Sequence, residues 1–150
     1  MNTQTMVWTG RTLTALFALF MLGASIAPKL LGMSVAEETM LQLGWPAGFA
    51  FMIGAIELTC LVLYLVPRTS LLGAVLMMAL LGGAMATQIR AGSPLFSHTL
   101  FSVYLGLFMW GGLWLRDARL RALFPFAGER RAVPSVVPSA VLQAGFDAAR

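Results

Sequence analysis

The sequence predicts an all-α protein, a transmembrane four-helix bundle whose helices run antiparallel, up and down. Hydrophobic residues make up 59% of the 150 positions and charged residues only 11%, whereas about 25% of the residues in an ordinary soluble domain are charged. Four apolar stretches are each about 20 residues long, which is the length that crosses a hydrocarbon core about 30 Å thick. The connections between them are short, and short connections make neighbouring helices antiparallel.

The first two apolar stretches cover approximately residues 12–31 and 46–66. A more polar segment separates them and contains the pattern Ser34-x-x-Glu37. This pattern predicts a capping box that opens a short helix, and Gly44 is the expected closing residue. We expect this short helix to lie at the outer interface of the membrane, between the first and second spans.

The third and fourth apolar stretches cover approximately residues 70–89 and 94–115. A tight turn precedes the third stretch, where Thr69 and Ser70 supply hydroxyl groups. Because hydroxyl side chains accept hydrogen bonds from the first free N–H groups of a helix, we expect them to cap the third helix.

The composition changes after the fourth stretch. The segment RDARLRALFPF predicts a basic amphipathic extension of the fourth helix, with Leu120, Leu123 and Phe124 toward lipid and the arginines toward headgroups. Residues 128–150 are rich in Ala, Pro, Ser and Val, which predicts a disordered cytoplasmic tail. The chain therefore divides into a transmembrane domain, residues 1–127, and this tail.

Basic residues gather at one end of the predicted bundle. That end holds Arg11, Arg68, Arg116, Arg119, Arg121, Arg130, Arg131 and Arg150. The other end holds Lys29 and Arg90. Because loops rich in Lys and Arg remain in the cytoplasm, we expect both termini to be cytoplasmic. The arginines lie beside apolar segments and form no stripe alternating with exposed aromatics, so the expected partner is the lipid bilayer and not nucleic acid.

Several kinds of site are excluded by residue counts. The single cysteine, Cys60, cannot form an intramolecular disulfide or a C-x-x-C redox pair. The single histidine, His98, cannot build a haem or zinc site alone. Phosphate-binding and hydrolase motifs are also absent from the sequence. We therefore expect no metal site, no covalently bound cofactor and no self-contained catalytic or redox centre, which leaves open whether the chain takes part in an enzymatic reaction.

Glu57 is the only charged residue in the second apolar stretch. It lies roughly 15 Å from the outer end of its helix, where an isolated charge costs on the order of 3 kcal/mol or more. It must therefore be protonated, paired or hydrated. Lys29 and Arg90 are the candidate cations, and Thr87 shares a helix face with Arg90 beside Gly83.

Polar residues of the outer half thus form a candidate ligand-binding set. Its members are Lys29, Glu57, Thr87, Gln88, Arg90 and His98. Intramembrane carboxylates usually mark ligand or proton sites. A polar cluster can also fix the register of helices without any chemistry, so a purely structural role is the alternative.

Three segments of the sequence form a distinctive set, namely LGWPAGFAFMIGAIEL, PRTSLLGAVLMMALLGGAMATQIRAGSPLFSH and WGGLWLRDARLR. With them, from about residue 11 to residue 125, the sequence resembles the DoxX-like family of small four-helix bacterial membrane proteins. Glu57 and Arg90 fall at matching positions, and Lys29 corresponds to the lysine that the family carries at the end of its first helix. Gln88 stands where many relatives have a histidine, which argues against histidine-dependent proton transfer or metal binding at that position.

The resemblance implies a multi-pass protein of the bacterial cytoplasmic (inner) membrane. Relatives called DoxD and DoxX are associated with quinone-linked sulfur oxidation and with membrane oxidoreductase complexes. The implied function is an accessory subunit that binds a quinone-like or other amphipathic small molecule in an outer-leaflet polar pocket, while an oxidoreductase partner subunit supplies electrons. Two alternatives remain open. One is a small proton-coupled transporter or channel that uses Glu57 within a homo-oligomer, and the other is a structural membrane scaffold without ligand.

Overall fold

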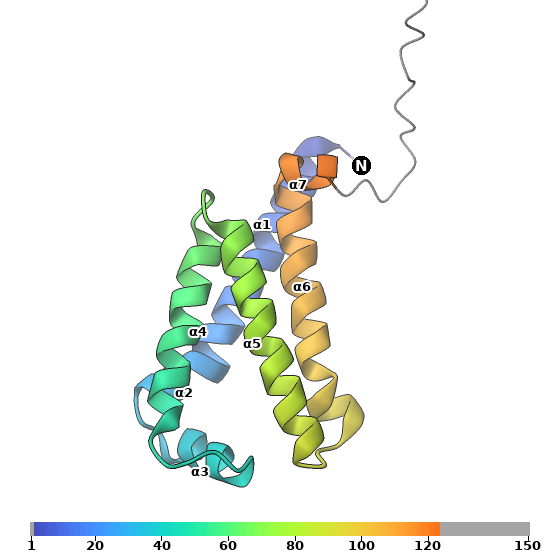
Figure 1. Ribbon diagram of the computed structural model, residues 1–150. Helices are drawn as coiled ribbons and strands as arrows, with labels where there is room; N and C mark the ends of the chain where they lie inside the picture. Colours follow the sequence, from blue (N-terminus) through green and yellow to red (C-terminus); the bar gives the residue numbers. More distant parts are fainter. Residues whose placement is uncertain (1, 124–150) are drawn as a thin grey trace, which may run out of the picture.

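A computed structural model of the chain describes residues 2–123. In this range the regular elements are all helices, which confirms the predicted all-α class (Figure 1). The predicted tail, residues 128–150, and Phe124 lie outside the described residues.

The first helical stretch consists of α1 (Thr3–Phe20), the π-helical segment η1 (Met21–Ile26) and α2 (Ala27–Leu30). It begins well before residue 12, so Arg11 lies within the helix and not ahead of it. The threonine hydroxyls of the polar first turns find acceptors within the helix, as Thr9 Oγ1 donates to Thr5 O at 2.9 Å. The apolar pattern therefore underestimates the length of this helix.

Pro28 gives a physical reason for the π-helical segment. Proline has no N–H, and its ring clashes with the carbonyl four residues earlier, here that of Ala24. Immediately before the proline the helix widens, so that the N–H of Ala27 donates to the carbonyl of Leu22, five residues back. Such a π-bulge lets the chain pass a proline without ending the helix.

A short helix, α3 (Ser34–Gln42), follows the first stretch. The helix was predicted, but the capping box was wrong. Met33 is the N-cap, Ser34 is the first helical residue, and no side chain caps the free N–H groups. Gly44 closes the helix as predicted, with a left-handed φ of 80° that suits glycine.

The next two helices are α4 (Phe49–Leu65) and α5 (Ser70–Arg90), joined by a tight turn. Thr69 is the N-cap of α5. Contrary to the prediction, its side chain makes no capping hydrogen bond to this helix. Its Oγ1 donates to the carbonyl of Leu63 at 2.9 Å. That carbonyl lacks a helical donor because the residue four positions later is Pro67. The hydroxyl thus completes the end of α4 and not the start of α5.

The last elements are the π-helical segment η2 (Leu95–Thr99), α6 (Phe101–Arg116) and α7 (Ala118–Leu123). The basic segment RDARLRALFPF was expected to extend the fourth helix, but α6 ends at Arg116 and the helix breaks at Asp117, which has extended backbone angles of φ −109° and ψ 108°. The Asp117 carboxylate then accepts a hydrogen bond from the N–H of Arg119 at 2.8 Å. An aspartate that can cap a new helix therefore makes α7 a separate element.

The break changes the surroundings of the leucines that were predicted to face lipid. Leu120 is only 5% exposed and packs in the core cluster, so that prediction was wrong for Leu120. Leu123 is 71% exposed. Figure 1 shows α7 at the end of the bundle beside the start of α1, where Leu120 can cover the core.

Long helices pack around one core. α6 packs against α1 and α5, while α4 packs against α5, η1 and α2. The largest fully buried side chains are Phe17, Ile26, Leu61, Tyr64, Met77, Met109 and Leu113. In Figure 1, α4 and α5 lie side by side at their turn and diverge toward α3. Here the two ends of the bundle are called the α7 end and the α3 end.

Within residues 2–123, three helical stretches are long and apolar enough to cross a membrane, namely Thr3–Leu30, Ser70–Arg90 and Leu95–Arg116. The helix of the second predicted span, α4, is also apolar but is shorter than these three stretches, with 17 residues.

Candidate functional site

Lys29 of α2 and Glu57 of α4 form an ion pair toward the α3 end. Lys29 Nζ lies 2.6 Å from Glu57 Oε1, and the two side chains are 16% and 12% exposed. Ser25 completes the group. Its Oγ accepts a hydrogen bond from Lys29 Nζ at 2.8 Å and donates one to Glu57 Oε2 at 3.0 Å. Both oxygens of the carboxylate therefore have a donor, and of the two candidate cations Lys29 is the one that pairs with Glu57.

Helix spacing and a glycine bring these groups together. Ser25 and Lys29 are four residues apart, a separation that places side chains on one helix face. Across from them, Gly54 precedes Glu57 by about one turn of α4, and a Cβ at Gly54 would lie 2.8 Å from Lys29 Cβ. The missing side chain lets α2 approach α4 closely enough for direct contact between the charges.

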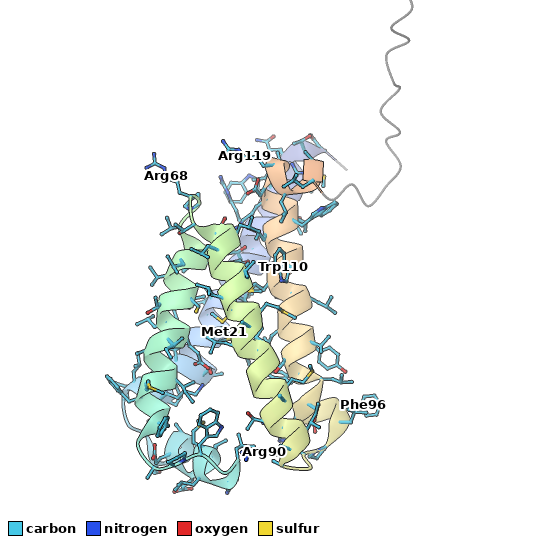
Figure 2. The ribbon with its side chains drawn as sticks, in the orientation of Figure 1. Met21, Arg68, Arg90, Phe96, Trp110 and Arg119 are labelled. Carbon is cyan, nitrogen blue, oxygen red and sulfur yellow. The ribbon has the colours of Figure 1, made fainter. Side chains whose placement is uncertain are left out.

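Arg90 does not pair with Glu57. Its Nη2 donates to the carbonyl of Leu43 at 2.7 Å, and its guanidinium lies against Gly44. Figure 2 shows Arg90 at the end of α5 nearest to α3. Arg90 is the last residue of α5, and Leu43 is the C-cap of α3. Free carbonyls at the end of a helix attract cations. The long side chain therefore reaches the end of α3, while the carboxylate deeper in the bundle already has Lys29.

The other predicted residues are not joined to the ion pair by any hydrogen bond in the described range. Thr87 Oγ1 donates to Gly83 O of its own helix at 2.9 Å. Gln88 Oε1 is buried and has no hydrogen-bond partner within residues 2–123. His98 is exposed, with its Nδ1 2.8 Å from Ser97 Oγ. The six predicted residues thus separate into one ion pair and four residues with other surroundings.

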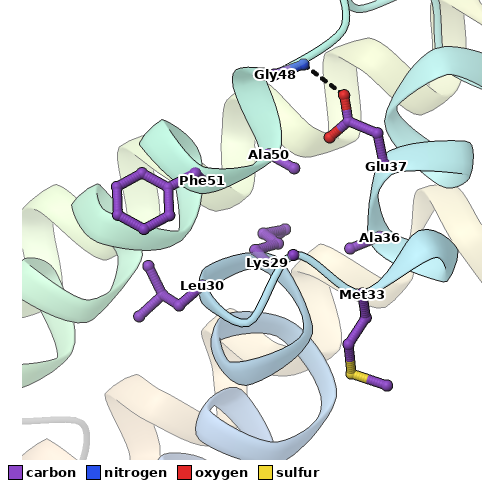
Figure 3. Close-up of a pocket in the computed structure, with 9 residues that line it drawn as sticks. Lys29, Leu30, Met33, Ala36, Glu37, Gly48, Ala50 and Phe51 are labelled. Carbon is purple, nitrogen blue, oxygen red and sulfur yellow. Dashed lines mark hydrogen bonds between the residues drawn. The ribbon is translucent and has the colours of Figure 1, made fainter.

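A cavity of about 320 Å³ adjoins the ion pair, between α2, α3 and the start of α4 (Figure 3). Its lining is mostly apolar and consists of Lys29, Leu30, Gly32, Met33, Ala36, Glu37, Gly48, Ala50 and Phe51. Glu37 Oε1 accepts a hydrogen bond from the N–H of Gly48, which joins α3 to the start of α4. Lys29 therefore belongs both to the ion pair and to the wall of the cavity.

Two polar residues of this region were missed by sequence reasoning. Ser25 could have been found from its spacing of four residues to Lys29. Glu37 was assigned to a capping box, and no sequence signal places it beside Gly48, because that contact depends on how α3 folds back onto α4. Elsewhere in the described part of the chain, no three His, Cys, Asp or Glu side chains come close enough to hold a metal ion.

Long apolar helices and a charge pair shielded between them define this chain as a helical membrane protein. The profile of the DoxX-like family matches residues 12–112, more than half of the chain and a range that includes Lys29, Glu57 and Arg90. The chain belongs to the DoxX-like family. Comparisons with curated proteins and with solved structures each gave no match.

Proposed function

We propose that the protein crosses the bacterial cytoplasmic membrane four times, with antiparallel spans and both termini in the cytoplasm. With 17 residues, α4 extends about 26 Å, near the lower limit for a membrane-spanning helix. The α7 end carries most of the arginines and would face the cytoplasm. In this orientation α3 lies at the outer interface, over the cavity.

The cavity beside α3 carries the functional proposal. Sites for small molecules are mostly apolar, contain a few polar groups and measure about 300–1,000 Å³. At about 320 Å³ and with a largely apolar lining, this cavity is suited to the ring of a small amphipathic molecule. We assign a quinone-like molecule as the leading ligand class.

The polar groups of the cavity would fix the ligand's orientation. Lys29 Nζ uses two of its three hydrogens, on Ser25 and Glu57. The third can donate to a ligand carbonyl. Glu37 Oε2 has no hydrogen-bond partner in residues 2–123 and can accept from a ligand hydroxyl. A quinone offers carbonyls and a quinol offers hydroxyls, so both forms could be held.

An accessory role follows from the residues available. The chain has one cysteine and one histidine, so its own side chains offer no redox pair. We propose that the protein binds and orients the amphipathic molecule for an oxidoreductase partner subunit, which exchanges the electrons. α3 acts as the cover of the site, held by the Glu37–Gly48 and Arg90–Leu43 hydrogen bonds.

The test uses a short-chain quinone, decylubiquinone, titrated into the purified protein and followed by quenching of tryptophan fluorescence. We expect saturable quenching in the parent. Ala36→Phe fills the cavity from its α3 wall and should weaken binding at least about tenfold, because the added ring occupies the ligand's volume. Ala84→Phe, at an exposed position of α5, is the matched control and should bind like the parent.

The unfolding temperature of both variants, measured without quinone, shows whether each has folded. Two results would contradict the proposal. One is quenching in the parent that does not saturate, and the other is equal affinity in the parent and a folded Ala36→Phe variant.

A further inference from the structure

The α7 end carries a large excess of positive charge. Within residues 2–123 its arginines are Arg11, Arg68, Arg116, Arg119 and Arg121, and its only acidic residue is Asp117. The Asp117 carboxylate accepts hydrogen bonds from backbone N–H groups of α7 and forms no salt bridge with an arginine in this range. The charge of the arginines is therefore not balanced by the neighbouring side chains.

Two of these arginines are used within the fold. Arg116 Nη2 donates to Tyr64 O at 2.8 Å, and its guanidinium carbon lies 4.9 Å from the centre of the Tyr64 ring. Arg121 Nη1 donates to the carbonyls of Trp114 and Leu115 near the end of α6. Both guanidinium groups thus complete helix ends, where free carbonyls need donors.

The other three arginines face outward. Arg68, on the turn between α4 and α5, and Arg119, on α7, are exposed and have no side-chain partner in the described structure. Figure 2 shows both at the same end of the molecule. The Arg11 guanidinium lies 5.5 Å from the centre of the Trp8 ring, and Trp8 is 61% exposed. An exposed tryptophan beside cations is typical of the boundary between lipid tails and headgroups.

Exposed apolar side chains follow these arginines closely in the chain. Leu71 and Leu72, just after the turn that carries Arg68, are 48% and 53% exposed, and Leu123 on α7 is 71% exposed. A molecule that binds here must therefore contact the guanidinium groups with one part and the neighbouring apolar side chains with another. A phospholipid has this order of groups, with its phosphate above its acyl chains.

We propose that the free arginines of the α7 end, with Arg68 and Arg119 as the principal contacts, bind the headgroups of anionic phospholipids. The guanidinium group matches two phosphate oxygens at once, and the net negative charge of the headgroup is not cancelled as it is in a zwitterionic lipid. Each arginine near an anionic lipid surface favours it by about fivefold. This surface lies at the opposite end from α3 and does not depend on the quinone proposal.

The experiment places the full chain in nanodiscs of phosphatidylglycerol and phosphatidylcholine in equal amounts. Lipids that stay bound after transfer to detergent are then counted by native mass spectrometry. We expect the parent to retain phosphatidylglycerol preferentially. The double variant Arg68→Gln/Arg119→Gln should lower the ratio of retained phosphatidylglycerol to phosphatidylcholine by about fivefold per arginine.

Arg90→Gln is the matched control, because it removes one arginine from the α3 end, and it should leave the ratio unchanged. Since Arg68 and Arg119 are exposed and have no side-chain partners in the described residues, the double variant should keep the unfolding temperature of the parent. The proposal is overturned if the parent shows no preference, if the double variant keeps the parental ratio, or if Arg90→Gln lowers the ratio as much as the double variant.

Discussion

At the residue scale, the main feature is that Glu57 has partners for both carboxylate oxygens. Lys29 Nζ and Ser25 Oγ approach different oxygens, and Lys29 also donates to Ser25. Removing the cation would leave a mostly buried carboxylate with only a hydroxyl donor, and an unpaired charge in such surroundings is costly. The two charged residues should therefore depend strongly on each other.

A double-mutant cycle measures this dependence. We expect Lys29→Gln and Glu57→Gln each to lower the free energy of unfolding, and the double variant to lose less than the sum of the two. The coupling should be about 1–3 kcal/mol. The measurement is denaturant unfolding of the purified protein in detergent micelles.

Arg90 provides the comparison for this cycle. Because it binds Leu43 O and not the carboxylate, Arg90→Gln and Glu57→Gln should be additive within about 0.5 kcal/mol. Coupling of Glu57 to Arg90 as strong as that to Lys29 would show that the assignment of partners is wrong.

The sequence could identify Glu57 and limit its partner to two candidates, Lys29 and Arg90, because few cations lie near the expected depth of the carboxylate. It could not decide the position of Arg90, because depth along a helix says nothing about the direction in which a long side chain turns. Gln88 shows the same limit. Its buried Oε1 without a partner in residues 2–123 follows from the packing around the end of α5, which no spacing in the sequence specifies.

At the scale of elements, α4 and α5 are held together by backbone contact. A Cβ on Gly73 would lie 2.1 Å from the backbone N of Tyr64 and 2.5 Å from the carbonyl carbon of Leu63. Backbone atoms cannot move aside as a flexible side chain can. Gly82, further along α5, has no atom within 4 Å of the corresponding position.

These two glycines form a matched pair. Gly73→Ala should destabilise the protein by about 1–3 kcal/mol, because α4 and α5 must separate to admit the methyl group. Gly82→Ala should cause no loss, since the added methyl meets open space and alanine favours a helix. Thermal unfolding in one detergent compares them, and equal loss in both variants would contradict the close α4–α5 packing.

Each predicted apolar stretch overlaps one of the long helices, but several helix ends differ from the prediction. Hydropathy marks where a helix can lie in lipid, whereas a helix ends where its backbone hydrogen bonds find other partners. α1 therefore extends into a polar segment, and the chain breaks at Asp117 because that side chain can cap α7. Thr69 likewise donates to α4, owing to the missing N–H of Pro67.

At the scale of the whole molecule, the two ends of the bundle differ in packing. All buried residues of α5 lie between Ser70 and Leu81, and none lies in its last turns. The α7 end is thus closed by Leu120 and the helix-capping arginines, while the α3 end is more open and contains the cavity. Sites that must admit ligands are drawn from the less tightly packed parts of proteins.

The proposed orientation leads to a topology experiment. Reporter domains fused after Val66 and after Arg121 should both be cytoplasmic, and one inserted within residues 37–43 should be external. The reason is the excess of arginine at the α7 end. A cytoplasmic signal from the α3 insertion would contradict the four-span arrangement.

The π-helical segment η1 has a consequence for insertions and deletions. A π-helical turn holds about one residue more than the α-helical turn that it replaces. Deleting Gly23, which has no atom within 4 Å of the place where a Cβ would lie, would let the segment close into an α-helix that bends at Pro28. The faces of α1 and α2 would keep their relative direction, because the wide turn contains the one residue that is lost.

The same deletion in a regular part of α1 would turn the preceding residues by about 100° and remove their contact with α6. Along this first helical stretch, a change of one residue in length is therefore tolerated best at η1.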